Sequence, residues 1–219
     1  DETGKIKLCD KAGTDKILEK YSDRVVGIKL YFDTDSPHVK DVTPLREACA
    51  YARELGVSLM VHSSNSPCSM KELLSELSAG DILTHAFHGG KNTALDDGFG
   101  AVLEAKARGV IIDVGFAGHV HTDFHVLGEA IRRGVLPDVI STDITRLSAY
   151  KRGGRYGMTM CMSIARALGM SEDDIFRALA VDLYLFRSYV LIHKRRRKSL
   201  DSLRKKFVKP LPCVVFFDG

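Results

Sequence analysis

Residues that can bind a metal ion or transfer a proton stand at the ends of several apolar, β-branched runs of the sequence. They are Lys29, His62, His85, Asp113 and Asp143. In folds built on parallel strands, the carboxyl ends of the strands meet at one edge, and active sites lie there. Two neutral imidazoles and a carboxylate are typical zinc ligands, and a carboxylate beside the metal can take a proton from bound water. Together the residues predict a metal site, whereas any one histidine alone would as readily be structural.

Lys29 is the unusual member of this set. It lies in the apolar stretch GIKLYF (27–32), where an unpaired ammonium group would be costly to bury. An ammonium group has no lone pair, so it cannot coordinate a metal. Burial lowers the pKa of a lysine, and Lys29 therefore fits the site only if it loses its proton.

The elements that must position these residues alternate between two types. Five short runs read as strands: RVVGIKL (24–30), VSLMVH (57–62), DILTHA (81–86), GVIIDVG (109–115) and DVISTD (138–143). Helical patterns with start and stop signals lie between and after them, at 43–56, 69–80, 101–109, 124–134, 158–169 and 171–180. This alternation predicts βαβ units and a parallel sheet. A spacing of about 30 residues suits a (β/α)8 barrel and a doubly wound sheet equally well. The absence of GxGxxG and GxxxxGK[ST] motifs weakens a nucleotide-binding interpretation.

Composition narrows the class of protein. The chain has 219 residues, 45% hydrophobic and 27% charged, which is an ordinary globular balance. We expect no membrane span, because no apolar run approaches the required length, and we expect no signal peptide at the polar start. The five cysteines are scattered without a CxxC pair, which predicts reduced thiols and a cytoplasmic location.

The net charge of +4 comes from one segment of the chain. Nine of the 32 Lys and Arg residues lie from Lys194 to Lys209, so the rest of the chain is mildly acidic. Nucleic-acid binding by the body is therefore not supported. The basic segment could contact RNA or an anionic membrane, but poor order is the simpler expectation.

Several stretches, in order, resemble the amidohydrolase superfamily, specifically the deacetylase and dihydroorotase-like metallo-dependent hydrolases. They are VVGIKL, LMVHSSNSP, GDILTHAFHG, ARGVIIDVG and LPDVISTDI, and the resemblance covers about residues 15–180. It implies a TIM-barrel enzyme with two divalent metals, usually zinc. It also implies hydrolysis of a C–N amide or cyclic amide bond, or an ester, in a small molecule by metal-bound hydroxide.

The resemblance also implies roles for individual residues. Lys29, by its match in GIK, would be carboxylated and bridge both metals. His62 and His85, in MVH and THAFH, would ligate the second metal. Asp143, in STD, would ligate the first metal and act as general base and then general acid. Apart from the resemblance, we expect Asp113 to be structural or to support the ligands rather than to bind the metal itself.

The sequence departs from the family pattern before Lys29. No HxH strand precedes it, so we expect the C-terminal five βα units of a barrel. The pair His119-Val-His121 occurs in a later unit, either as a substitute ligand pair or as part of a surface or substrate loop. Phe116 stands where related enzymes often have a histidine, and His119 is a candidate substrate contact.

The loop AYKRGGRYG supplies two further candidates. Arg152 and Arg155 could contact an anionic substrate group, although solvated loop charge explains them equally well. We expect a partial barrel domain at 1–185 and a basic tail at 186–219. Five units would leave two open parallel edges, which predicts a homo-oligomer or an unstable chain. The alternatives to an enzyme are a catalytically incompetent fragment or relic and, less favoured, a nucleic-acid-binding module.

Overall fold

A parallel sheet of five strands forms the centre of the protein. The computed structural model describes residues 11–21, 25–117, 121–144, 157–179 and 215–218. The strands are β1 (Gly27–Tyr31), β2 (Ser58–His62), β3 (Ile82–Thr84), β4 (Ile111–Ile112) and β5 (Val215–Asp218). They are ordered β4-β3-β2-β1-β5, and every pairing is parallel. The predicted parallel α/β fold is confirmed.

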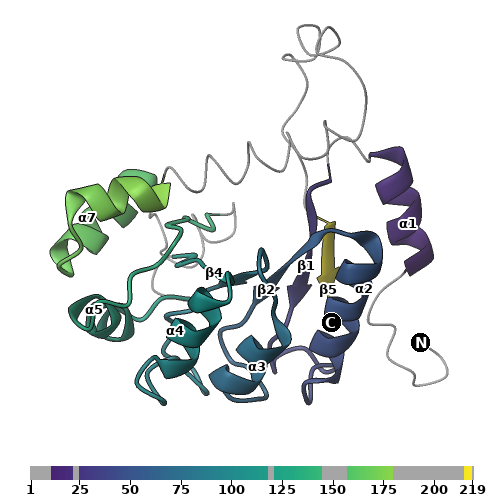
Figure 1. Ribbon diagram of the computed structural model, residues 1–219, viewed down its shortest axis with the longest axis horizontal. Coiled ribbons are helices and arrows are strands. Elements are labelled where there is room, and N and C mark those ends of the chain that lie inside the picture. Colours follow the sequence, from purple (N-terminus) through teal and green to yellow (C-terminus); the bar gives the residue numbers. More distant parts are fainter. Residues whose placement is uncertain (1–10, 22–24, 118–120, 145–156, 180–214, 219) are drawn as a thin grey trace, which may run out of the picture.

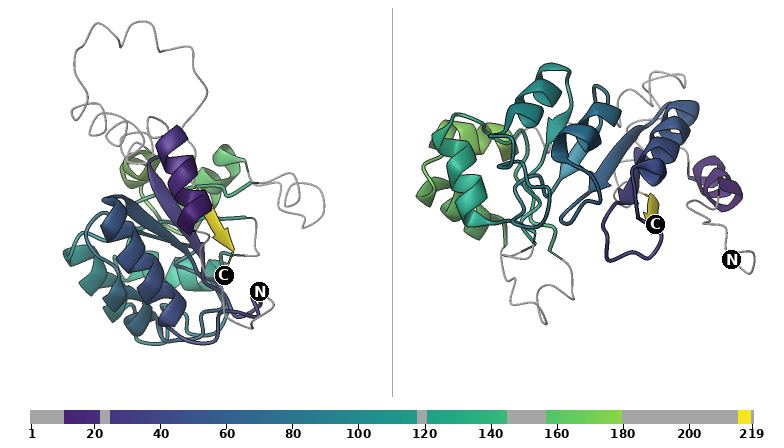
Figure 2. Two further views of the ribbon diagram at one scale, coloured as in Figure 1. Left: turned by 90° about the vertical axis from the view of Figure 1, so that its right-hand side faces the viewer. Right: turned by 90° about the horizontal axis from the view of Figure 1, so that it is seen from below.

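Helices cover one face of this sheet (Figures 1 and 2). Those packed in a row against it are α2 (Thr43–Leu55), α3 (Met70–Glu76) and α4 (Gly100–Ala107). The others are α1 (Lys11–Lys20), α5 (Phe124–Arg132), α7 (Met158–Ala167) and a helix at residues 172–179. The predicted start of α3 is confirmed, because Ser69 Oγ accepts a hydrogen bond from Glu72 N at 3.1 Å.

The two faces of the sheet carry different side chains. On the helical face, the alternate residues Ile28, Leu30, Leu59, Val61, Leu83 and Ile112 are all at most 1% exposed. On the opposite face, Lys29, Met60, Ile82 and Ile111 are only half-buried. Register aligns Tyr31 with His62 and His62 with Thr84 across the strands. The ends of the strands therefore bring polar side chains into one row on the face without helices.

The fifth predicted strand is largely absent. In DVISTD, only Val139 forms an isolated parallel bridge, with Asp113. The segment still follows the edge of the sheet, because Val114 N and Phe116 N donate to Val139 O and Ser141 O. Strand geometry ends there as the backbone turns, and Asp143 itself has a positive φ of 43°.

The expectation that β1 would be an open edge is wrong. Strand β5 pairs with β1 from Ile28↔Val215 to Tyr31↔Asp218. A strand edge presents unpaired N–H and C=O groups, and an apolar segment late in the chain satisfies them. Part of the predicted tail thus joins the sheet, while the proposed boundary at 185/186 lies outside the described residues.

Within the described part of the chain, no helix combines the length and the apolar character needed to cross a membrane.

Candidate metal centre

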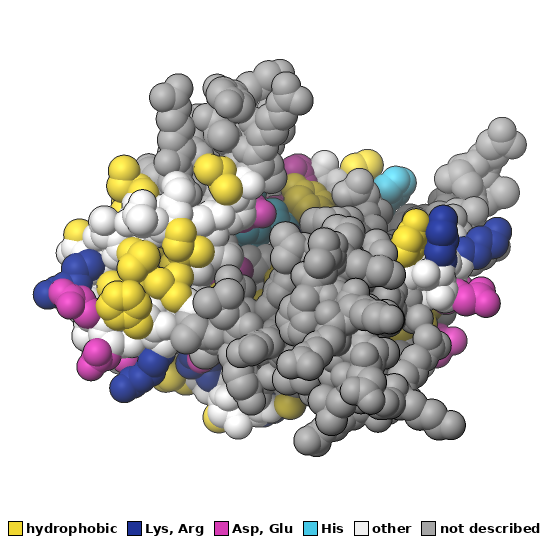
Figure 3. Space-filling model, turned by 90° about the horizontal axis from the view of Figure 1, so that it is seen from above, with side chains coloured by type: hydrophobic (Ala, Val, Ile, Leu, Met, Phe, Trp, Pro, Cys, Tyr) yellow, Lys and Arg dark blue, Asp and Glu magenta, His cyan; other side chains and the backbone are white. Residues whose placement is uncertain are grey.

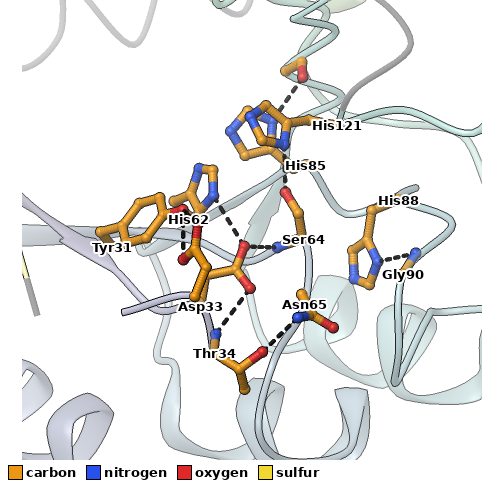
Figure 4. Close-up of polar contacts among 12 residues, drawn as sticks. Tyr31, Asp33, Thr34, His62, Ser64, Asn65, His85, His88, Gly90 and His121 are labelled. Atoms are coloured by element: carbon orange, nitrogen blue, oxygen red, sulfur yellow. Dashed lines mark hydrogen bonds and ion pairs between the residues drawn. The ribbon is translucent and has the colours of Figure 1, made fainter. Parts of the chain in front are cut away.

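Three histidines gather at the carboxyl end of the sheet. His62, His85 and His121 each offer a ring nitrogen, and these nitrogens all lie within 4.8 Å of one another. Their ring centroids are 4.4 to 4.8 Å apart. Figure 4 shows the three rings converging from separate segments, and Figure 3 shows histidine and acidic side chains side by side near the middle of one face. The predicted pair of strand-end histidines is therefore brought together, with a third histidine beside it.

His85 is completely buried and is hydrogen-bonded through Nδ1. It directly follows β3 with a left-handed backbone (φ 63°), and Nδ1 lies 2.6 Å from Gly115 O. A carbonyl oxygen can only accept, so Nδ1 carries the proton and Nε2 has the lone pair. Burial, followed by the neighbouring His62 and His121, holds the pKa of His85 well below 6.5. Its buried Nε2 has no hydrogen-bond partner, which is the state of a nitrogen ready to ligate a metal.

Gly115 makes this arrangement possible. A Cβ there would lie 2.5 Å from His85 Nδ1 and 2.4 Å from Thr84 Oγ1. Its φ of +55° also favours glycine. The glycine of the DVG sequence thus lets the backbone carbonyl approach and orient the imidazole.

His62 ends β2 and is also buried. Its ring stacks on Tyr31, with centroids 4.4 Å apart. Its Nε2 lies 3.4 Å from Asp33 Oδ2 but has no hydrogen-bond partner. Asp33 itself is 4% exposed and accepts hydrogen bonds from Thr34 N and Ser64 N. A buried carboxylate therefore borders the histidines on the β1 side.

Asp143 and Lys29 lie beside the same cluster. The carboxylate Oδ2 of Asp143 is 3.8 Å from His85 Nε2, and this side chain is 33% exposed. Burial lowers the pKa of Lys29, while attraction to Asp143 and Asp113 opposes the shift. Lys29 is also close enough to His85 to lower the pKa of its imidazole. All four predicted metal-binding residues therefore lie in one neighbourhood.

Asp113 has the structural role expected of it. Its Oδ2 accepts from Thr84 Oγ1 at 2.6 Å and from Ser141 Oγ at 2.8 Å, while Oδ1 accepts from Gly115 N at 3.3 Å. The carboxylate thus ties β3, the segment after β4 and residues 139–141 together. These bonds leave Asp113 poorly placed to be a metal ligand.

Three nearby residues were not predicted. The strand that was expected to end at Leu30 continues to Tyr31, and this extra residue places Tyr31 and then Asp33 at the site. His88 is 1% exposed, its Nδ1 accepts from Gly90 N, and its Nε2 has no hydrogen-bond partner. Burial lowers the pKa of His88 to about 4. The candidate substrate residues His119, Arg152 and Arg155 lie outside the described residues.

The site fits a divalent cation. Buried polar atoms without partners are rare, because each one loses its hydrogen bonds to water. Two such atoms, Nε2 of His62 and of His85, occur here side by side. With carboxylates at their border, they form the imidazole and oxygen donor set that zinc, manganese, iron and cobalt accept.

Sequence comparison with curated proteins finds deacetylases. The chain is 30% identical over 180 residues to a deacetylase of Enterococcus faecalis, covering 80% of this chain and 48% of that protein. It is 35% identical over 136 residues to a deacetylase of Brucella anthropi, covering 59% of this chain and 34% of that protein. The chain thus spans half or less of the length of these relatives. No protein-family profile matches it.

Structural comparison agrees with the sequence comparison. A dihydroorotase crystal structure superposes with a TM-score of 0.73 at 26% identity, over 85% of this chain and 48% of that one. An adenine deaminase superposes with a TM-score of 0.69 at 30% identity, over 78% and 48%. The sheet with its outer helices corresponds to part of a TIM barrel in these neighbours. The chain is therefore a relative of the deacetylase and dihydroorotase-like metallo-dependent hydrolases of the amidohydrolase superfamily, matching about half of their length.

Proposed function

We propose that this chain carries the metal-binding and proton-transferring residues of a divalent-metal-dependent hydrolase that cleaves an amide or cyclic amide C–N bond in a small molecule. The observation that carries the proposal is the pair of buried, unpartnered Nε2 atoms of His62 and His85 beside the Asp143 carboxylate. Relatives described as deacetylases support the choice of an amide substrate.

Asp143 is the residue suited to move protons. Its side chain is 33% exposed and lies beside the buried His62 and His85, so it can reach both water and substrate. In the proposed reaction, water oxygen bonds to the carbonyl carbon and its proton passes to Asp143. The same carboxyl group then protonates the leaving nitrogen as the C–N bond breaks.

A metal held by His62 and His85, with Asp143 and carboxylated Lys29 as further ligands, would polarise the substrate carbonyl and acidify the attacking water. Burial lowers the pKa of Lys29, and so favours the neutral amine that can combine with carbon dioxide. The resulting carbamate would be negative and would lie close to the carboxylates of Asp143 and Asp113. Because like charges repel, the carbamate would be stable only with cations between it and these carboxylates.

Metal content tests this proposal directly. The purified chain, supplied with zinc, manganese or cobalt, would be analysed by plasma mass spectrometry beside a His62→Ala, His85→Ala double variant. We expect about one or two ions per chain, lost in the double variant. Metal-replete chain would then be screened against N-acyl amino acids and cyclic amides, with Asp143→Asn as the matched control.

The outcomes separate an enzyme from an incompetent relative. Turnover that disappears in Asp143→Asn supports the proposal, whereas metal binding without turnover of any amide favours a binding-only relic. A chain that binds no metal under any of these conditions would overturn the proposal altogether.

A further inference from the structure

We propose that His121 is a protein ligand of the metal centre, so that His62, His85 and His121 together hold one divalent ion. This inference rests on the proposed metal dependence, because it adds a third histidine ligand to that same site. His121 is the only residue that the described part of the chain adds to the two strand-end histidines in a group close enough to share an ion.

The position of His121 is favourable for ligation. Its ring centroid is 4.4 Å from that of His85 and 4.8 Å from that of His62. Imidazole nitrogens that share a tetrahedral zinc ion at about 2.0–2.1 Å lie about 3.3 Å apart. The nitrogens here lie within 4.8 Å of each other, so small side-chain rotations would bring them to that spacing.

The orientation of each ring agrees with this role. Metal-binding histidines generally use the second ring nitrogen to hydrogen-bond a neighbouring group, which fixes the ring. His85 Nδ1 does so with Gly115 O, and His121 Nδ1 lies 2.7 Å from Ser64 Oγ. Nε2 of His121 is then the nitrogen that would ligate. Figure 4 shows Ser64 directly below the His121 ring.

Three imidazoles make a sufficient set for one ion. Three protein ligands with an open fourth position are the usual arrangement of a catalytic zinc site. The set is neutral, and the nearby Asp33 and Asp143 carboxylates would balance the charge of the cation. This set of three is complete without a preceding HxH pair, and the proposed ligands Asp143 and Lys29 would add to it.

Cobalt spectroscopy tests ligation by His121 itself. In a His121→Cys variant, bound Co²⁺ should show a thiolate-to-cobalt charge-transfer band in the near ultraviolet, because the new sulfur replaces the nitrogen. The wild-type chain, which keeps its native cysteines, provides the baseline. His88→Cys, which changes a buried histidine in the same region, should show no band.

Zinc affinity gives the complementary measurement. We expect His121→Ala to raise the zinc dissociation constant by more than about 100-fold, since losing only a group that orients a ligand costs about 10- to 100-fold. Ser64→Ala should fall in that smaller range, and His88→Ala should stay within about threefold of wild type. Circular dichroism would confirm that each variant is folded.

The results distinguish this inference from the proposed function. Tight zinc binding by wild type that is retained in His121→Ala, or a band absent from His121→Cys, would overturn the role of His121 and leave the proposed function standing. A wild-type chain that binds neither zinc nor cobalt would overturn both.

Discussion

The buried polar groups at the two ends of the parallel sheet differ in how completely they are hydrogen-bonded. At the amino end, the buried Asp81 carboxylate accepts from Arg53, from Leu59 N at 3.0 Å and from Ser78 N at 2.8 Å. Asp138 accepts from Lys106 and from Ile112 N in the same manner. At the carboxyl end, His62 and His85 keep unpartnered Nε2 atoms, and His85 and Asp143 have left-handed backbones. The carboxylates at the amino end thus have hydrogen-bond partners within the chain, whereas the imidazoles at the carboxyl end keep nitrogens that can bind a ligand. In TIM-barrel enzymes the active site generally lies at this carboxyl end.

The largest expected effect is at the amino end. Asp81→Ala would leave the backbone N–H groups of Leu59 and Ser78 without their acceptor, and it would remove the partner of the part-exposed Arg53. We expect a loss of roughly 2–4 kcal/mol in the free energy of unfolding, measured by urea denaturation, mainly from the two unsatisfied N–H groups. Zinc affinity of the folded fraction should not change. A loss below about 1 kcal/mol would show that the amino end is not the stabilising one.

Acid should destabilise the carboxyl end through His88. Its pKa is about 4 in the folded chain and 6.5 as the ordinary value, so the unfolded chain binds more protons between these limits. Stability is therefore complete above about pH 6.5 and falls as the pH drops toward 4, by roughly 3 kcal/mol from this residue. His85 adds a loss of the same sign. In chelator-treated protein, His88→Asn should flatten the stability profile over this range, and an unchanged profile would contradict the assignment.

Zinc should stabilise the wild-type chain through the same end. A ligand at about 100 times its dissociation constant raises the free energy of unfolding by about 2.7 kcal/mol if it binds only the folded state. Thermal melts with and without zinc measure this increase. The His62→Ala, His85→Ala variant should gain nothing, and an equal gain in that variant would place the bound zinc elsewhere.

The smallest expected effect on stability comes from removing a single helix cap. Ser69 precedes α3 in the loop that follows β2, and so lies at the same carboxyl end of the sheet as the histidines. Ser69→Ala removes the bond to Glu72 N and should cost about 1 kcal/mol of stability. Zinc affinity should be unaffected. A change in affinity would show that the helix cap and the metal site are coupled.

Much of the architecture was predictable because strand and helix periodicities are local. The runs around Lys29, His62 and His85 form strands as expected, and their end residues converge because parallel strands share an edge. Strand ends were less predictable. Asp33 was missed because β1 continues through Tyr31, and DVISTD forms only one bridge because its backbone turns away.

Contacts between distant segments were the hardest to foresee. The closeness of His121 to His62 depends on the path of the loop after β4, which no local pattern specifies. The parallel pairing of β5 with β1 likewise joins segments with the rest of the domain between them. Residue type alone could suggest that His121 binds a metal or that residues 215–218 form a strand. It could not show that His121 lies beside His62 or that β5 pairs with β1.

Synthesis on the ribosome delivers β1 long before its partner β5. Strands β1 to β4 leave the ribosome in the order in which they pair, so the sheet can grow as the chain emerges. Among the described residues, the other side of β1 has no strand partner until residues 215–218 follow, and an uncovered strand edge can pair with a different chain. A nascent chain stalled before Val215 should therefore associate with its neighbours more readily than the released protein.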